Sequence, residues 1–247
     1  MSEPFFDYIS NSRFSVSNKM YGIESHEKRY HRYQYNALPV VQKPSITLVE
    51  AMAKRKSYRK FKDDGLPLEK LSSVLKFSIS VNEESKGFKK YSFPSGGGFY
   101  PIETYLIVNK VSDLEAGLYH YATVDHSIAK IKESDECSLQ EVNQLYGCSF
   151  DSVPPVILHM TMVKSRTIHK YGSLAYVLSL SESGYRGQNI YLAASAFDLG
   201  VCAMGGGNYE KINQLLGVDG VNEHHIHGVA IGLPAKELLT KYPEGQL

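Results

Sequence analysis

The sequence predicts an α+β fold. Helical and strand patterns alternate irregularly along the 247 residues, two strands are joined as a hairpin around 124–126, and no regular strand–helix–strand repeat occurs. The longest helical pattern, over 173–199, is rich in alanine and apolar on most sides, so we expect a buried central helix. These observations favour an α+β fold over a doubly wound parallel sheet.

The composition restricts the classes of function. With 43% hydrophobic and 21% charged residues and a net charge of +1, the chain resembles an ordinary globular domain, and it has no long run of like charge to attract nucleic acid. No signal peptide and no apolar run of membrane-spanning length is found, so we expect a cytoplasmic protein without a membrane span. Cys137, Cys148 and Cys202 lack metal or redox spacing and are predicted to be reduced thiols.

Residues 1–44 are predicted to form an irregular arm that precedes one domain over 45–247. The tyrosine-rich stretch KRYHRYQYN at 28–36 follows neither a helical nor a strand period, and Pro39 and Pro44 interrupt the arm. We expect the arm to wrap over the body of the protein or over a partner subunit.

Two helices are predicted to open the domain. Ser45 is expected to cap the first, which ends in a basic stretch, so that RKSYR at 55–59 falls at or just beyond its C-terminus. A turn then leads to a second helix with apolar residues at helical spacing from Leu68 to Leu75. The segment EESKGFKKYSF, 83–93, is predicted to be a loop.

The rest of the chain alternates between strands and helices. A strand, a hairpin, a helix closed by Gly147 and an apolar strand are predicted in turn over 103–111, 117–133, 138–147 and 154–164. After the long helix, a strand, a triple glycine, a helix and a final strand are predicted over 201–204, 205–207, 209–217 and 225–234.

RKSYR and two triple glycines are candidates for a ligand site. Three cations and a hydroxyl can bind a phosphate, although cations at a helix C-terminus can also simply offset the helix dipole. The glycines at 96–98 and 205–207 can form turns, but three in a row favour a flat surface for a planar ligand. Neither run fits a Rossmann or P-loop fingerprint, which disfavours NAD and ATP folds.

Lys170 and Tyr171 lie between a predicted buried strand and the long helix. Lys170 is either an exposed lysine or a partly desolvated one that can accept a proton near neutral pH, with Tyr171 donating or relaying a proton. Glu182 in the long helix is likewise either a solvated carboxylate or a buried polar group. The histidines of NEHHIHG, 222–228, alternate between strand faces without supporting carboxylates, so we predict no metal site.

Six motifs in this order resemble the nitroreductase-fold flavoproteins: RKSYRKF, PSGGGFYPIE, GLYHY, KYG, ESGYRGQN and LGVCAMGGGNYEKINQLLG. More narrowly, the chain resembles the SagB-type azoline dehydrogenases, which oxidise thiazoline and oxazoline rings to thiazole and oxazole during the maturation of peptide natural products. The resemblance runs from about Tyr30 to Pro234. It implies a mostly antiparallel sheet flanked by helices, with a long buried central helix, in a homodimer that binds FMN at the subunit interface.

The resemblance also assigns residues to FMN. The phosphate, ribityl chain and pyrimidine edge would be held by Arg55, Lys56, Ser57 and Arg59. The residues that approach from the partner subunit would be Pro94, Ser95, Gly96 and Gly97. Those along the isoalloxazine would be Ala203, Met204, Gly205 and Gly206. Additional contacts would come from Gln188, Asn189 and, for the phosphate, Lys241.

The resulting hypothesis is an FMN-dependent azoline dehydrogenase. Lys170 with Tyr171 would remove the ring proton, flavin N5 would accept the hydride, and dioxygen would reoxidise the flavin to give hydrogen peroxide. The partners implied are an azoline-containing precursor peptide and a cyclodehydratase complex. Three alternatives remain open from the sequence: an NAD(P)H-dependent nitro or quinone reductase, an azoline oxidase acting on carrier-bound nonribosomal peptides, and a non-catalytic scaffold.

Overall fold

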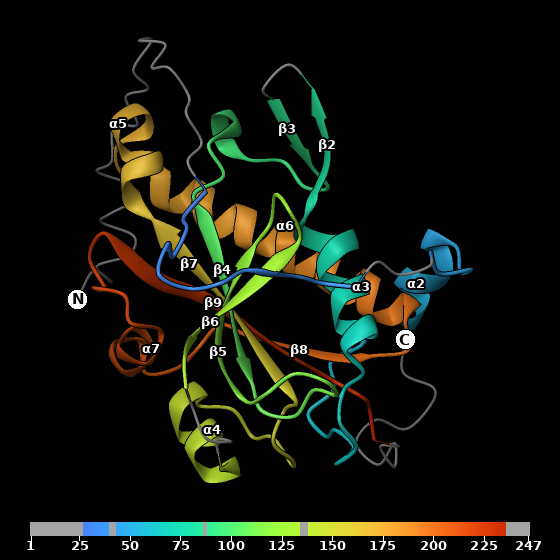
Figure 1. Cartoon of the computed structure of the whole chain (residues 1–247). Coiled ribbons are helices and arrows are strands. Elements are labelled where there is room, and N and C mark those ends of the chain that lie inside the picture. Colours follow the sequence, from blue (N-terminus) through green and yellow to red (C-terminus); the bar gives the residue numbers. More distant parts are fainter. Residues whose placement is uncertain (1–26, 40–42, 86–87, 134–137, 236–247) are drawn as a thin grey trace, which may run out of the picture.

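A seven-stranded antiparallel sheet forms the centre of the protein, with strand order β1-β6-β5-β4-β7-β9-β8 (Figure 1). The computed structural model describes residues 27–39, 43–85, 88–133 and 138–235. The strands of this sheet are β1 (Asn36–Ala37), β4 (Ile102–Val108), β5 (Gly117–Ala122), β6 (Ser127–Lys132), β7 (Val156–Val163), β8 (Gly200–Met204) and β9 (Glu223–Gly232).

Helices cover both faces of the sheet. They are α2 (Leu48–Lys54), α3 (Leu68–Ile79), α4 (Leu139–Tyr146), α5 (Ile168–Tyr171), α6 (Leu174–Ala196) and α7 (Tyr209–Leu216), with two short 3-10 turns, η1 (Gly96–Gly98) and η2 (Lys164–Arg166). One apolar core lies between the sheet and helices α3 and α6, and includes Leu75, Ile190 and Val229. A second lies on the opposite face under α4 and α7, and includes Tyr146 and Ile212. Covered on both faces, β4 is buried along its whole length.

These elements confirm the predicted fold class, a helix-flanked, mainly antiparallel sheet. The long helix is also confirmed, as α6, but it is not buried all round. Its inner side is buried, whereas Tyr176, Leu180 and Tyr185 are 42%, 38% and 48% exposed. No helix in the described ranges is both long and apolar enough to cross a membrane.

The segment predicted to be a loop at 83–93 contains a hairpin instead, formed by β2 (Val81–Ser85) and β3 (Phe88–Tyr91). Its register places Glu83 opposite Lys90 and Glu84 opposite Lys89. The prediction was wrong because consecutive polar residues give no alternation of apolar and polar positions.

The first helix begins two residues later than predicted. Thr47, rather than Ser45, is its N-cap: Thr47 Oγ1 accepts the Glu50 N–H at 3.2 Å, and Glu50 Oε2 accepts the Thr47 N–H at 2.7 Å. This reciprocal pair satisfies two of the backbone groups that a helix start leaves open. The apolar residues of α2, Leu48, Val49 and Met52, are exposed.

The described part of the predicted arm, 27–39, lies against the sheet. β1 pairs with β6, and Lys28 Nζ donates to Tyr105 Oη at 2.8 Å and to Glu223 Oε2 at 2.7 Å. Tyr35 Oη lies 2.9 Å from His120 Nδ1. The residues of the arm at 1–26 and 40–42 lie outside the described residues.

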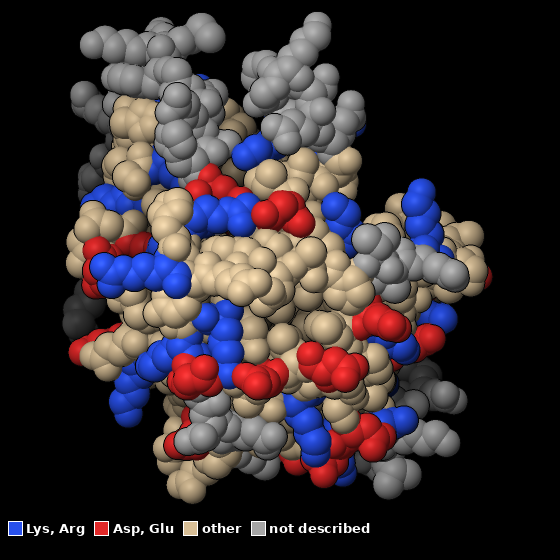
Figure 2. Space-filling model, viewed as in Figure 1, with Lys and Arg blue, Asp and Glu red and all other residues tan. Residues whose placement is uncertain are grey.

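Surface charge is mixed on the face shown in Figure 2. There, Lys and Arg side chains alternate with Asp and Glu side chains. The described residues on this face therefore present no broad patch of a single sign.

Candidate active site

The predicted site residues gather in two clusters near opposite ends of α6. RKSYR and the second glycine run lie near its C-terminal half. The first glycine run lies beside its N-terminal part, where Gly96 packs against Leu178, and Lys170 lies in α5, which directly precedes α6 (Figure 1). α6 has 23 residues and is therefore about 34 Å long.

Tyr191 organises the first group, the Arg55 cluster, which consists of Arg55, Ser57, Tyr191 and Ala203. The Tyr191 hydroxyl lies 2.8 Å from Ser57 Oγ and accepts the Ala203 N–H at 2.9 Å. Ser57 also forms a parallel bridge with Val201, which attaches RKSYR to the edge of the sheet beside β8. The structure thus brings together RKSYR and AMGG, which are about 150 residues apart in the sequence.

One cation of RKSYR, Arg55, lies beside this hydroxyl pair. Arg55 is the C-cap of α2, as its predicted place at the helix end requires, and its guanidinium lies over the Tyr191 ring, 5.5 Å from the ring centroid. The Lys56 ammonium lies over the Tyr58 ring at 4.6 Å, and Arg59 is exposed. Within the described ranges Arg55 forms no ion pair with a carboxylate, so its charge remains available to an anion.

The AMGG segment presents small residues beside these cations. Ala203 is exposed although the rest of β8 is buried. A Cβ at Gly205 would meet no atom within 4 Å, and one at Gly206 would meet only the Tyr146 carbonyl oxygen, at 4.0 Å. The Met204 side chain points inward against Gly228. Open backbone next to a cation and two hydroxyls fits a planar ligand with a phosphate, so these residues fit FMN.

The first glycine run forms a tight turn, and its approach to the flavin stays a prediction. Gly97 and Gly98 have φ angles of 65° and 70°, a backbone region that side chains disfavour, so the turn interpretation applies to both. A Cβ at Gly97 would also lie 2.6 Å from the Tyr171 hydroxyl oxygen. Glycine is therefore required at 97 by packing against Tyr171 within the same chain.

Lys170 lies in aromatic surroundings. Its ammonium is 5.4 Å from the centroid of the Phe99 ring and 5.3 Å from that of Tyr171, and the two rings meet edge to face. Its side chain is half-buried. Gly97, Phe99, Lys170 and Tyr171 form the second group, the Lys170 cluster, with Pro94, Ser95 and Gly96 alongside in the same loop.

Residues of ESGYRGQN play mostly supporting roles. Gln188 is exposed, whereas Asn189 Nδ2 donates to the Ser92 carbonyl at 3.1 Å and so anchors the chain just before PSGG. Glu182 is 1% exposed and pairs with Arg186 at 2.8 Å, which excludes the solvated alternative. Lys241 lies outside the described residues.

Three site residues were missed from the sequence. Tyr191 joins the parts of the Arg55 cluster, Phe99 covers Lys170, and Arg186 lies under the Phe93 ring at 4.4 Å. A tyrosine in the buried stripe of an otherwise apolar helix was the available signal for Tyr191, because a buried phenol needs a hydrogen-bond partner.

The histidines of NEHHIHG do not converge. His224 stacks on Tyr176, while His225 Nδ1 lies 3.4 Å from His159 Nδ1. Burial, together with the neighbouring His227 and His224, lowers the pKa of His225 to about 3, so it is neutral at pH 7. Among the described residues, no group of three or more His, Cys, Asp or Glu side chains is arranged to hold a metal ion.

The sequence comparisons give one consistent result. The profile described as "Nitroreductase family" matches residues 52–233. A protein of Methanocaldococcus jannaschii that is named as a nitroreductase is 32% identical over 174 residues, which cover 69% of this chain and 84% of that protein.

Solved structures share the fold. A protein of Ralstonia eutropha named as a nitroreductase superposes with a TM-score of 0.69 at 23% identity, covering 92% of this chain and all of that one. A chain of the Escherichia coli microcin synthetase McbBCD complex with truncated pro-MccB17 bound gives 0.63 at 18% identity, with coverages of 96% and 84%. One from Desulfovibrio desulfuricans, in complex with FMN, gives 0.50 at 18% identity, with coverages of 78% and 88%.

Proposed function

The chain belongs to the nitroreductase family of oxidoreductases, and from this membership we propose that it is an FMN-dependent dehydrogenase that converts azoline rings of a peptide to azoles. The observation that carries the proposal is the Lys170 cluster. Beside a glycine turn, Lys170 can act as a base and Tyr171 as a proton donor. Oxidation of an azoline ring needs such a base to remove a proton from a ring carbon.

The likeness to a chain of the microcin synthetase complex supports a peptide substrate. That structure was solved with truncated pro-MccB17 bound, and the similarity covers 96% of the present chain. The identity of 18% shows a common fold alone. The proposed substrate class therefore depends on the Lys170 cluster as well as on this likeness.

A homodimer would complete the site. Gly96 of the loop beside Lys170 packs against Leu178, whereas Tyr191 of the Arg55 cluster lies about 20 Å further along α6, so the two clusters are too far apart to contact the same flavin ring within one chain. If both clusters act on one FMN, they come from two copies of the chain. Exposed apolar residues of α6 and α2 support a second copy: Leu180, Tyr185, Leu48, Val49 and Met52.

FMN would be held by the Arg55 cluster of one copy. Arg55 and Ser57 would bind the phosphate and ribityl hydroxyls, and Ala203, Gly205 and Gly206 would lie along the ring system. When bound, FMN supplies the two-electron acceptor that no side chain provides. The neighbour solved with FMN supports this choice of cofactor.

The residues of the chain would handle the proton. Oxidation removes one proton and one hydride from the azoline, and dioxygen, as the terminal acceptor, becomes hydrogen peroxide. Lys170 in its neutral form accepts the proton from the ring carbon, and the Tyr171 hydroxyl orients the ring by donating a hydrogen bond. The Phe99 ring, with its centroid 5.4 Å from the Lys170 nitrogen, would hold the Lys170 side chain in place beside the substrate ring.

Two measurements test the proposal. Purified protein should show flavin absorbance, and it should remove two hydrogens from an azoline peptide without added NAD(P)H, as seen by mass spectrometry. Rapid NAD(P)H oxidation with no azole formed would instead identify a nitro or quinone reductase. A cyclodehydratase, which forms azolines by removing water, is the enzyme class we propose as the supplier of the substrate.

A further inference from the structure

A pocket of about 310 Å³ lies on the side of α5 away from Lys170. Its walls come from the end of β7 and η2, from the α5–α6 junction, and from the loop that precedes β9. Ile168 and Gly172, four residues apart and thus on one side of the α5 turn, face the pocket. Lys170 lies on the other side of the turn, with its ammonium over the Phe99 ring.

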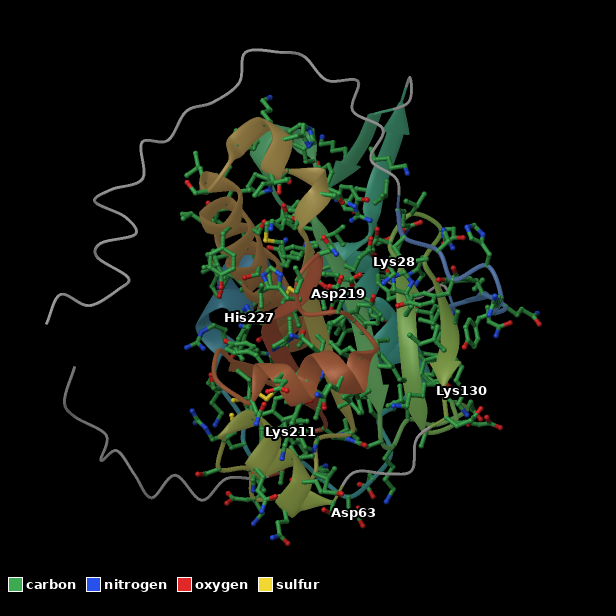
Figure 3. The ribbon with its side chains drawn as sticks, turned by 90° about the vertical axis from the view of Figure 1, so that its left-hand side faces the viewer. Lys28, Asp63, Lys130, Lys211, Asp219 and His227 are labelled. Carbon is green, nitrogen blue, oxygen red and sulfur yellow. The ribbon has the colours of Figure 1, made fainter. Side chains whose placement is uncertain are left out.

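The walls are held together by backbone and side-chain hydrogen bonds. The Lys164 N–H donates to the Asn222 carbonyl at 2.8 Å, which joins η2 to the loop before β9. Asp219, labelled beside this loop in Figure 3, accepts the N–H groups of Val221, Asn222 and Glu223 at 2.8–2.9 Å. These bonds hold the pKa of Asp219 well below its usual range. The pocket is therefore preformed rather than opened by a ligand.

The pocket lining is mostly apolar, and its charged group is a cation. Met162, Ile168, Tyr176 and Val221 supply the apolar surface, and Lys164 supplies an ammonium. None of the described residues that line the pocket is acidic. Val221 is 65% exposed, a large value for an aliphatic side chain at the rim of a pocket.

Two further groups adjust the electrostatics. Burial, with a contribution from Lys164, lowers the pKa of His224, so this lining residue is neutral at pH 7 and leaves Lys164 as the cation. Gly172 and Ser173, which precede the first turn of α6, also line the pocket, so the positive end of the helix dipole adds to the field of Lys164.

We propose that this pocket binds part of the peptide substrate, namely an apolar side chain next to a carboxylate. The apolar lining accepts the side chain, while Lys164 and the α6 terminus attract the carboxylate. The inference rests on the proposed function, because it takes the peptide that carries the azoline as the occupant.

The separation between the pocket and Lys170 fixes where these residues lie in the peptide. One helical turn with its side chains is about 10 Å across. An extended peptide covers about 3.4 Å per residue, so the apolar residue lies about three positions from the azoline.

Direct binding of labelled product peptides tests the inference. The probes are fluorescein-labelled thiazole peptides that carry Phe-Asp three positions before or after the ring, with Phe-Lys and Gly-Gly versions for comparison. We expect the Phe-Asp probe of one orientation to bind about tenfold more tightly than the Gly-Gly probe, measured by fluorescence anisotropy. Equal binding of all probes overturns the inference.

Charge reversal at the pocket provides the specific test. Lys164→Glu should lower affinity for the Phe-Asp probe about fivefold and raise affinity for the Phe-Lys probe, the range expected for a partly exposed ion pair. Val221→Asp should lower the affinity for the Phe-Asp probe by a similar factor. Lys211→Glu, the same charge change on α7 (Figure 3), is the matched control and should alter neither probe. An unchanged preference in Lys164→Glu overturns the inference.

Turnover separates this inference from the proposed function. Lys164→Glu and Val221→Asp should oxidise a minimal N-acyl azoline as fast as the unmodified protein does, and should raise KM only for the Phe-Asp substrate. If the minimal azoline is oxidised but the Phe-Asp substrate has no advantage, the pocket inference fails alone. If no azoline is oxidised at all, the proposed function fails, and the inference fails with it.

Discussion

The hydroxyl of Tyr191 lies 2.8 Å from Ser57 Oγ. This contact joins the C-terminal part of the longest helix to the segment that carries Arg55, and the same hydroxyl accepts the Ala203 N–H. A single phenol thus fixes the spacing between a cationic segment and an open strand end, which sets the geometry that we propose for FMN.

Arg55→Ala should abolish or strongly weaken FMN binding, because it removes the unpaired guanidinium over Tyr191. The measurement is flavin absorbance per protein after gel filtration. Lys54→Ala is the matched control: this neighbouring cation is 3.8 Å from Asp198 and should retain flavin. Full occupancy in Arg55→Ala would contradict the phosphate assignment.

Lys170→Ala should retain FMN and the oligomeric state but lose at least about 100-fold in azole formation, the usual effect of removing a general base. Tyr171→Phe should lose less, because Lys170 remains. Mass spectrometry of the peptide product checks both variants. Unchanged turnover in Lys170→Ala would show that the proton leaves by another route.

Gly97→Ala should reduce the free energy of unfolding by about 2–3 kcal/mol, from an unfavourable positive φ and from a Cβ 2.6 Å from the Tyr171 hydroxyl. Gly98→Ala is the control, since its φ is similar but a Cβ there would meet nothing within 4 Å, so about 1 kcal/mol is expected. Tyr171→Phe should recover part of the Gly97→Ala loss. Equal losses at 97 and 98 would rule out the contact with Tyr171.

Glu182→Gln should reduce the free energy of unfolding by about 3–5 kcal/mol, because it leaves the Arg186 guanidinium buried without a charged partner. The double change with Arg186→Met should cost less than the sum of the two single changes. Asp63→Asn breaks an exposed pair with Lys110 and should cost less than about 1 kcal/mol. Urea unfolding curves provide the comparison.

The sequence predicted the fold better than the geometry of the site. β4, β7 and α6 are long and mostly apolar segments, so the sequence alone predicted them as elements. The β2–β3 hairpin was missed because its largely polar sequence shows no alternation of apolar and polar positions.

The site was predicted as a set of residues but not as two separated clusters. Local motifs indicate which residues can bind a phosphate or accept a proton, whereas the length of α6 decides which of them meet. The contact of Gly97 with Tyr171 was not predicted for the same reason, since it joins residues far apart in the sequence.

The stability of the protein should fall in acid because of Glu103. Burial alone would raise the pKa of this carboxyl, but hydrogen bonding from His120 and the charge of Arg166 hold it at about 2, against 4.5 when unfolded. The unfolded chain therefore binds the proton first, and about 3 kcal/mol of stability, fully present above pH 4.5, is lost as the pH falls toward 2. Glu103→Gln should flatten this part of the pH profile, and parallel profiles would contradict the assignment.

Because α6 joins the two clusters, its residue number also sets their relative angle. Each residue inserted or deleted between Tyr176 and Tyr191 would turn one cluster by about 100° around the helix axis relative to the other. Seven extra residues, close to two full turns, would nearly restore the phase while lengthening the helix by about 10 Å. Any change in the length of α6 therefore changes both the angle between the two clusters around the helix axis and the distance between them along it. Relatives that keep both clusters should keep the same number of residues between them.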